Sequence, residues 1–313
     1  MQCSIVAELS CNHNGSFEKA VDLISAAKNA GANAVKIQVF TPSEMTLDCD
    51  NENFVVPDGK WKGTLYSLYE KARTPLHWLK DLMDTAHQKN LSFITSVYHP
   101  KSLEITELFK VQIYKISSFE LNYTDLLVSV AKTNKPIILS TGMATEDEIK
   151  KAIETITKYN PRLALLKCTS KYPAPMTEMN LITIPAMAMK YGLPVGLSDH
   201  TRGITAPIVA TVYGASVIEK HLCLDRNCLD GEFSITPNRF KKMVQSIRLA
   251  EESIGEVKYG GKTQFRRSMV AIKDIKKNSP LTDENTGCFR TVIDGAMDIG
   301  LIAEKDYKTG DLI

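Results

Sequence analysis

The sequence predicts an α/β protein: a (β/α)8 TIM barrel followed by a small β-rich module. Short β-rich runs alternate with segments of helical apolar spacing, eight times within the roughly 250 residues that such a barrel occupies. The first strand continues into Cys11–Gly15, which is not the glycine-rich loop of a doubly wound dinucleotide-binding sheet. After Gly255 the alternation ends, which places the β-rich module at the C-terminus.

The order of the expected elements follows from β-rich composition and from apolar spacing. Pro75 suits a first helical turn, and Gly31 and Gly192 stand where helices should end. The eight expected strands are Ser4–Leu9, Ala34–Val39, Leu91–Thr95, Val111–Ile116, Pro136–Ser140, Leu163–Lys167, Leu193–Gly196 and Ser216–Lys220. The clearest expected helices are Phe17–Ala30, Pro75–Lys89, Glu146–Tyr159, Met179–Tyr191 and Pro237–Ile254.

Two segments depart from the alternation. Residues 41–74 carry Pro42, Pro57, Gly59 and Gly63, and a long loop of this kind in a barrel is typically an active-site lid. We expect a barrel domain at 1–256, a linker at 257–266 and a separate module at 267–313. Because fewer than about 50 residues can scarcely bury a core, the module should lean on the barrel or on a second subunit.

Composition excludes several classes of protein. Lys and Arg number 38 and Asp and Glu 36, so the net charge of +2 gives no nucleic-acid footprint. No apolar run approaches the roughly 20 residues of a membrane span, and the first residues do not resemble a signal peptide. The cysteines number seven, an odd count, and are scattered, so we expect a cytoplasmic protein. No two of them have CxxC spacing, so we expect no zinc knuckle.

Polar residues gather where the predicted strands end, which is the catalytic face of a barrel. His200 and His221 follow neighbouring strands, so their imidazoles should converge. Such a pair either binds a divalent metal ion or is hydrogen-bonded to neighbouring loops, and position alone leaves both open. For His13 and His99 we expect loop-stabilising roles.

Lysines and short hydroxyl side chains share this face. Lys36, Lys115, Lys167 and Lys220 should point to the barrel mouth, where cations and hydroxyls suit a ligand bearing phosphate and carboxylate. Two alternatives stay open. Some of these lysines pair with glutamates inside the barrel, or one of them forms a Schiff base as in barrel aldolases.

Six ordered strings stand out along the predicted barrel: Ala7–Gly15, Ala34–Gln38, Tyr114–Ser118, Leu139–Met143, Gly196–Thr201 and Ile218–His221. Together they make the barrel resemble the sialic acid synthase family. That resemblance implies a metal-dependent condensation of phosphoenolpyruvate with an acetamido sugar, giving a nonulosonic acid and phosphate by C–O cleavage. It also implies a C-terminal antifreeze-like (SAF) domain, here shortened, and a homodimer that is domain-swapped through it.

Further strings are similar to the pseudaminic acid synthase branch of that family, whose sugar substrate is 2,4-diacetamido-2,4,6-trideoxy-L-altrose. N-acetylneuraminate and legionaminate synthesis are the alternatives within the family. A degenerate sugar-binding barrel is the non-enzyme alternative. The strings are Lys167–Pro175, Glu178–Leu181, Thr183–Pro185 and Phe233–Pro237.

The resemblance also implies roles at matching positions. His200 and His221 would bind Mn2+, with Mg2+ or Co2+ as alternatives, and Glu120 would handle protons and activate water. Arg290 of the antifreeze-like domain would reach the partner's sugar site. The residues implied for phosphoenolpyruvate are Lys36, Thr95, Lys115, Ser118, Ser140, Ser170 and Ser198. Those implied to face the sugar are Glu8, Tyr172 and Asp230.

Overall fold

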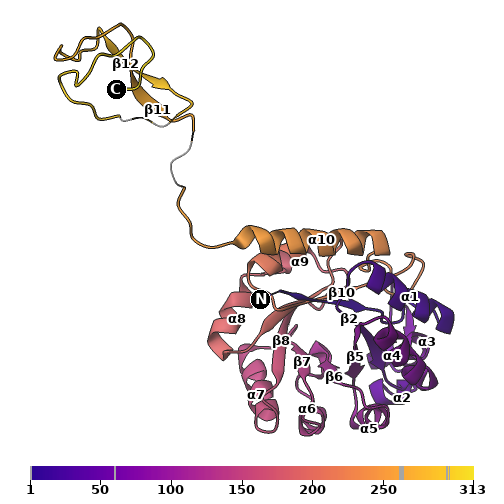
Figure 1. Cartoon of the computed structure of the whole chain (residues 1–313). Helices are drawn as coiled ribbons and strands as arrows, with labels where there is room; N and C mark the ends of the chain where they lie inside the picture. The colour runs from indigo at the N-terminus through magenta and orange to yellow at the C-terminus, as the bar shows by residue number, and fades with distance from the viewer. Residues whose placement is uncertain (1, 60, 261–263, 294, 296) are drawn as a thin grey trace. The chain divides into compact units, whose positions relative to one another are not determined.

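The computed structural model contains a closed barrel of parallel strands surrounded by helices (Figure 1). It describes residues 2–59, 61–260, 264–293, 295 and 297–313. The chain divides into two compact units, Met1–Gly255 and Glu256–Ile313. The expected linker 257–266 falls in the second unit, and its residues 261–263 lie outside the described residues.

The predicted barrel is confirmed, with eight strands among the described residues. Around the barrel they run in the order β1-β10-β9-β8-β7-β6-β5-β2, and every neighbouring pair is parallel. The strands are β1 (Ser4–Glu8), β2 (Ala34–Val39), β5 (Ser92–Val97), β6 (Ile113–Ile116), β7 (Ile137–Ser140), β8 (Leu163–Cys168), β9 (Val195–Asp199) and β10 (Val217–His221).

Helices follow the strands and cover the outside of the barrel (Figure 1). Capping residues fix several of their ends: Ser16 accepts a hydrogen bond from the backbone of Lys19, and Gly192 ends a helix in the left-handed conformation. The helices are α1 (Phe17–Asn29), α4 (Leu79–Gln88), α5 (Pro100–Leu108), α6 (Thr124–Lys132), α7 (Glu146–Thr157), α8 (Thr183–Tyr191), α9 (Thr205–Val212) and α10 (Pro237–Ile254). Short 3-10 helices lie at Glu52–Phe54, Leu76–Trp78, Ser118–Glu120 and Met176–Glu178.

Side chains alternate between the two faces of each strand, which divides the buried core into a layer inside the barrel and a layer between strands and helices. In β5, Ile94 packs inside the barrel, while Phe93 and Val97 pack in the larger cluster between strands and helices. Because side chains of a strand alternate between its two faces, every second residue of each strand faces the barrel interior. Residues two positions beyond this apolar layer, toward the carboxyl ends, are the ones that reach the mouth.

Residues 41–74 are not the plain loop that the sequence predicted. They contain α2 (Pro42–Met45), a two-stranded sheet of β3 (Val55–Val56) and β4 (Gly63–Thr64), and α3 (Leu65–Ala72). Pro42, which suggested a loop, here begins α2, and Gly63 belongs to β4. None of the residues of α3 is buried.

The C-terminal unit is a small sheet-rich body. Its strands β11 (Arg267–Ala271) and β12 (Thr286–Arg290) pair antiparallel. Isolated antiparallel bridges join residues 270, 275 and 280 to residues 312, 307 and 302, respectively. Its buried cluster is Ala271, Ile275, Ala303 and Tyr307. Its assignment as an antifreeze-like domain stays a prediction.

Across the described residues, no helix has both the length and the apolar character needed to cross a bilayer.

The loop after β1 is held together by a buried histidine. Nδ1 of His13 accepts a hydrogen bond from the backbone N–H of Gly15 at 3.0 Å, and the ring packs edge-on against Trp78. Burial lowers the pKa of His13 from 6.5 to about 4. His99 likewise accepts from the backbone of Lys101 at the start of α5. Both histidines therefore support loops, as expected.

His13 should make the protein less stable in mild acid. Because the folded state binds this proton only near pH 4 and the unfolded state near pH 6.5, the free energy of unfolding falls as pH drops between these values. The His13 contribution between pH 7 and pH 5 is about 2 kcal/mol. Denaturant unfolding measures the free energy of unfolding at pH 7 and at pH 5. Its decrease between these two values should be smaller by about this amount in His13→Asn than in wild type. In the exposed control His87→Asn the decrease should equal that of wild type. An equal drop in wild type and His13→Asn would contradict the assignment.

Candidate functional site

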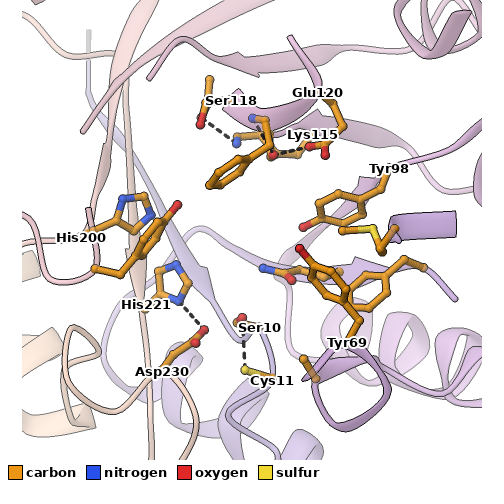
Figure 2. Close-up of a pocket in the computed structure, with 18 of the residues that line it drawn as sticks. Ser10, Cys11, Tyr69, Tyr98, Lys115, Ser118, Glu120, His200, His221 and Asp230 are labelled. Carbon is orange, nitrogen blue, oxygen red and sulfur yellow. Dashed lines mark hydrogen bonds and ion pairs between the residues drawn. The ribbon is translucent and has the colours of Figure 1, made fainter. Parts of the chain in front are cut away.

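A pocket of about 620 Å³ opens at the carboxyl ends of the barrel strands. It lies where the sequence placed the polar strand ends, and Figure 2 shows side chains from several strands converging on it. Ten of the expected site residues line it: Lys36, Lys115, Ser118, Glu120, Ser140, Tyr172, Ser198, His200, His221 and Asp230.

The two imidazoles lie side by side, as expected. The ring centroids of His200 and His221 are 5.4 Å apart, and both rings are buried. Tyr172 packs on His200 with ring centroids 4.4 Å apart, and Phe233 packs on His221 at 4.8 Å. These aromatic rings fix the orientation of both histidines.

Each histidine has an oxygen beside Nδ1. Nδ1 of His200 lies 3.2 Å from the carbonyl oxygen of Thr169, and Nδ1 of His221 lies 3.2 Å from Oδ2 of Asp230. The contact between His221 and Asp230 does not meet the geometry of a standard hydrogen bond. Burial lowers the pKa of His200 to about 3, so its ring is neutral at physiological pH.

This arrangement leaves Nε2 of each ring as the nitrogen available to a ligand. An oxygen partner at the other nitrogen is the usual support of a metal-binding histidine. Within the described ranges, no group of three or more His, Cys, Asp or Glu side chains is arranged to hold a metal ion. The two imidazoles are therefore the side chains of this site that could contribute to holding a cation.

Buried charges form the floor of the pocket. Nζ of Lys36 lies 3.2 Å from Glu8 and 3.1 Å from Glu219, and Nζ of Lys115 lies 3.8 Å from Glu219. All four side chains are almost completely buried. The expected pairing of lysines with glutamates inside the barrel is confirmed for Lys36 and Lys115.

The pKa shifts in this cluster follow from burial and pairing. Burial by itself favours the neutral carboxyl of Glu219, but the ammonium groups of Lys115 and Lys36 outweigh it and lower its pKa to about 2. Glu8 has weaker compensation, and burial raises its pKa. Burial opposes the charge of Lys36, yet the two carboxylates raise its pKa overall. The floor thus carries fixed charges of both signs.

Hydroxyl groups surround the ammonium of Lys115. Its Nζ donates to Oγ of Ser140 at 2.7 Å, and Oγ of Ser198 donates to Glu219 at 3.0 Å. Oγ of Ser118 lies 2.9 Å from Oγ of Ser170, which itself does not line the pocket. The site therefore offers short hydroxyl groups next to cations, which suits phosphate and carboxylate oxygens.

Glu120 lies on the same side of the pocket as Lys115 (Figure 2). The hydroxyl of Ser117 donates a short hydrogen bond to its carboxylate. Burial raises the pKa of Glu120 to about 7, against the opposing influence of Ser117 and Lys115. A carboxyl poised near neutrality both accepts and returns protons at physiological pH.

Besides Ser170, two of the expected barrel residues do not line the pocket. Thr95 alternates with Ile94, so it faces the helix layer, where its hydroxyl has no hydrogen-bond partner. Glu8 is fully buried in the charged floor, where Gln38 donates to it at 3.0 Å. The structure therefore does not place Thr95 or Glu8 where they were expected, and their contacts with phosphoenolpyruvate and with the sugar stay predictions.

Two of the four lysines are also displaced from the mouth. Lys220 faces outward, where its Nζ pairs with Asp199 at 2.7 Å. Lys167 donates to the backbone oxygen of Cys168 and to Thr169. Both lie one position out of step with the inward-facing residues of their strands, so neither lines the pocket.

Arg290 lies in the C-terminal unit, at the exposed end of β12. Its contact with a sugar site stays a prediction, as does the swapped homodimer.

Sequence reasoning did not assign several residues that line the pocket. Gln38 and Glu219 are two positions from Lys36 and His221, so strict two-residue alternation would have found them. The aromatic lining had no comparable signal, because it comes from loops and from α3. The unassigned lining includes Ser10, Cys11, Gln38, Phe40, Trp61, Leu65, Leu68, Tyr69, Tyr98, Tyr123, Cys168, Glu219 and Phe233.

Comparison with known proteins identifies the family. Residues 23–259 match the NeuB family. The chain belongs to the NeuB family. It is 41% identical to a pseudaminic acid synthase of Campylobacter jejuni, over 99% of this chain and 94% of the relative. It is 40% identical to a pseudaminic acid synthase of Helicobacter pylori, over 91% of this chain and 87% of the relative.

The solved structure of one relative has the same fold. It is an N-acetylneuraminic acid (sialic acid) synthetase from Leptospira borgpetersenii serovar Hardjo-bovis, crystallised with citrate. The TM-score is 0.76 at 29% identity, covering 84% of this chain and 88% of that one. The expected resemblance to sialic acid synthases is therefore confirmed.

Proposed function

We propose that this protein condenses phosphoenolpyruvate with 2,4-diacetamido-2,4,6-trideoxy-L-altrose, giving pseudaminic acid and phosphate. The observation that carries the proposal is one pocket in which buried ammonium and hydroxyl groups lie beside two neighbouring imidazoles. The names of the Campylobacter jejuni and Helicobacter pylori relatives support the choice of product.

Phosphoenolpyruvate would bind at the lysine and serine floor. Lys115 is buried beside Ser140 and lies near Glu219, so an incoming anion meets a fixed cation whose geometry needs no rearrangement. Ser118 and Ser198 would add hydroxyl donors. Ser170 would act through Ser118, which it contacts at 2.9 Å.

His200 and His221 would hold a divalent cation, with Mn2+ as the first candidate and Mg2+ or Co2+ as alternatives. The neutral ring of His200, the oxygen contacts at Nδ1 of both rings and the aromatic packing support this assignment. When bound, such a cation supplies Lewis acidity to the sugar aldehyde oxygen.

The remaining residues would orient the sugar and move protons. Tyr172 and Asp230 line the pocket next to the histidines, and Gln38 takes the place expected for Glu8. The C=C π electrons of phosphoenolpyruvate would form the new bond from carbon 3 to the aldehyde carbon. The C=O π bond of the aldehyde would open, its oxygen would take up a proton and become a hydroxyl, and carbon 2 would be left with positive character. Water then adds at carbon 2, with Glu120 accepting its proton, and the C–O bond to phosphate breaks.

The test is incubation with phosphoenolpyruvate, Mn2+ and a panel of acetamido sugars. We expect phosphate release with the diacetamido trideoxy sugar and a product of the mass of pseudaminic acid. Release with N-acetylmannosamine or with the legionaminate precursor alone would move the protein to another branch of the family. Absence of release with every sugar, or borohydride trapping of pyruvate on a lysine, would overturn the proposal.

Lys115 should dominate the affinity for phosphoenolpyruvate. Because a charge-assisted hydrogen bond contributes about 1.5–3 kcal/mol, Lys115→Ala should raise the Kd by about 10- to 100-fold. Isothermal titration calorimetry measures this without turnover. Lys167→Ala is the matched control, since Lys167 lies on a barrel strand but outside the pocket, and its Kd should stay at the wild-type value. Equal Kd values for wild type and Lys115→Ala would refute the role.

Removal of one imidazole should weaken metal binding directly. We expect His221→Ala to raise the Kd for Mn2+ by at least about 10- to 100-fold, the loss seen even when an outer partner of a metal ligand is removed. Electron paramagnetic resonance of free Mn2+ gives the Kd, and circular dichroism checks the fold. His87→Ala, in the exposed part of α4, is the control. Wild-type Mn2+ affinity in folded His221→Ala would defeat the metal assignment.

A further inference from the structure

The helix α3 presents an apolar face to the pocket instead of to the protein core. Leu65, Leu68, Tyr69 and Ala72, here called the α3 stripe, recur at the i, i+3, i+4, i+7 spacing of one helix face. All four line the pocket and are only half-buried. Among the described residues that pack against the barrel core, none belongs to the α3 stripe.

The α3 stripe adjoins an aromatic cluster, and together they form one wall of the pocket. Phe40 is buried directly after β2 and packs edge-on against Tyr69 and Tyr98, with ring centroids 5.7 Å and 5.3 Å apart. Burial raises the pKa of both tyrosines, so their hydroxyls stay protonated. The rings therefore hold Tyr69 of α3 against the barrel side of the pocket.

The polar atoms of this wall are confined to one part of it. Tyr69 and Tyr98 carry hydroxyls, and Oε2 of Glu44 accepts from the backbone of Thr41 at 2.8 Å and from the hydroxyl of Ser102. The side chains of Leu65, Leu68 and Ala72 have no polar atom, and Met45 and Val56 add further apolar lining. A sugar hydroxyl directed at the two leucines would lose water without gaining a partner there, whereas a methyl group would be accommodated.

The position of the wall identifies the part of the substrate that meets it. Tyr69 and Tyr98 lie across the pocket from His200 and His221 (Figure 2). Given the proposed function, on which this inference rests, the aldehyde carbon lies near the histidines. The sugar chain then extends toward the opposite wall with its far end.

We propose that the α3 stripe selects sugars whose far end is deoxygenated, with a methyl group at carbon 6, over sugars with a hydroxyl there. Leu65 and Leu68 are specificity-determining residues in this assignment. The covered group is the carbon 6 methyl.

The test compares two sugars that differ by one oxygen: 2,4-diacetamido-2,4,6-trideoxy-L-altrose and its 6-hydroxy counterpart. Each is measured as a substrate by kcat/KM, or as a competitive inhibitor where it is not turned over. We expect wild type to prefer the 6-deoxy sugar by at least about 10-fold, the usual discrimination of an apolar pocket. Leu68→Gln should lower that preference about 10-fold and leave the Kd for phosphoenolpyruvate unchanged.

Two further variants keep the result interpretable. Leu65→Gln lies on the same stripe and replaces Leu68→Gln if that variant does not fold. Glu70→Gln changes an exposed residue of α3 and should keep the wild-type preference. An unchanged preference in both folded stripe variants, an equal loss for both sugars, or no preference in wild type would overturn the inference. If wild type releases no phosphate with any sugar, the proposed function itself fails, which is a separate outcome.

Discussion

The structure depends most on the burial of opposite charges at one level of the barrel. Lys36 on β2 contacts Glu8 on β1 and Glu219 on β10, so three neighbouring strands meet through one ammonium group. Because an unpaired charge in such a position costs several kcal/mol, a shift in strand register would be strongly unfavourable. The same contacts hold Lys115 and Ser198 beside Glu219 in a fixed arrangement. Register and pocket chemistry are therefore set by one interaction.

The pocket has two sides of different origin. Barrel strands supply the charged floor and the histidines, whose positions follow from the pleat and from the closed hydrogen-bonding pattern. Most of the apolar wall comes from the connection between β2 and β5, including α3, and Tyr98 follows β5. The charged groups of the pocket thus lie on the barrel strands, which are the most constrained part of the fold. The apolar wall that shapes the pocket lies mostly on the segment that connects β2 and β5.

The sequence predicted the strands and most of the site because polar residues at strand ends are a local signal. The prediction was wrong where the strand face on which a side chain lies decides whether that side chain reaches the pocket. Thr95 and Lys220 stand at strand ends, as Lys36 and His221 do, but they are one position out of step with the inward face. Glu8 faces inward, but its side chain is fully buried against Lys36 and Gln38 and does not line the pocket. The α3 stripe was beyond sequence reasoning, because its apolar spacing alone does not distinguish a core from a cavity.

The barrel closes without any strand from residues 41–74. β2 pairs directly with β5 over six residue pairs, so the hydrogen-bonded cylinder is complete whatever the intervening segment contains. Mutations, insertions and deletions there leave the cylinder's backbone pairing intact. Substitutions of the residues by which this segment lines the pocket should therefore alter the pocket's shape, while the buried charges that the strands position keep their places.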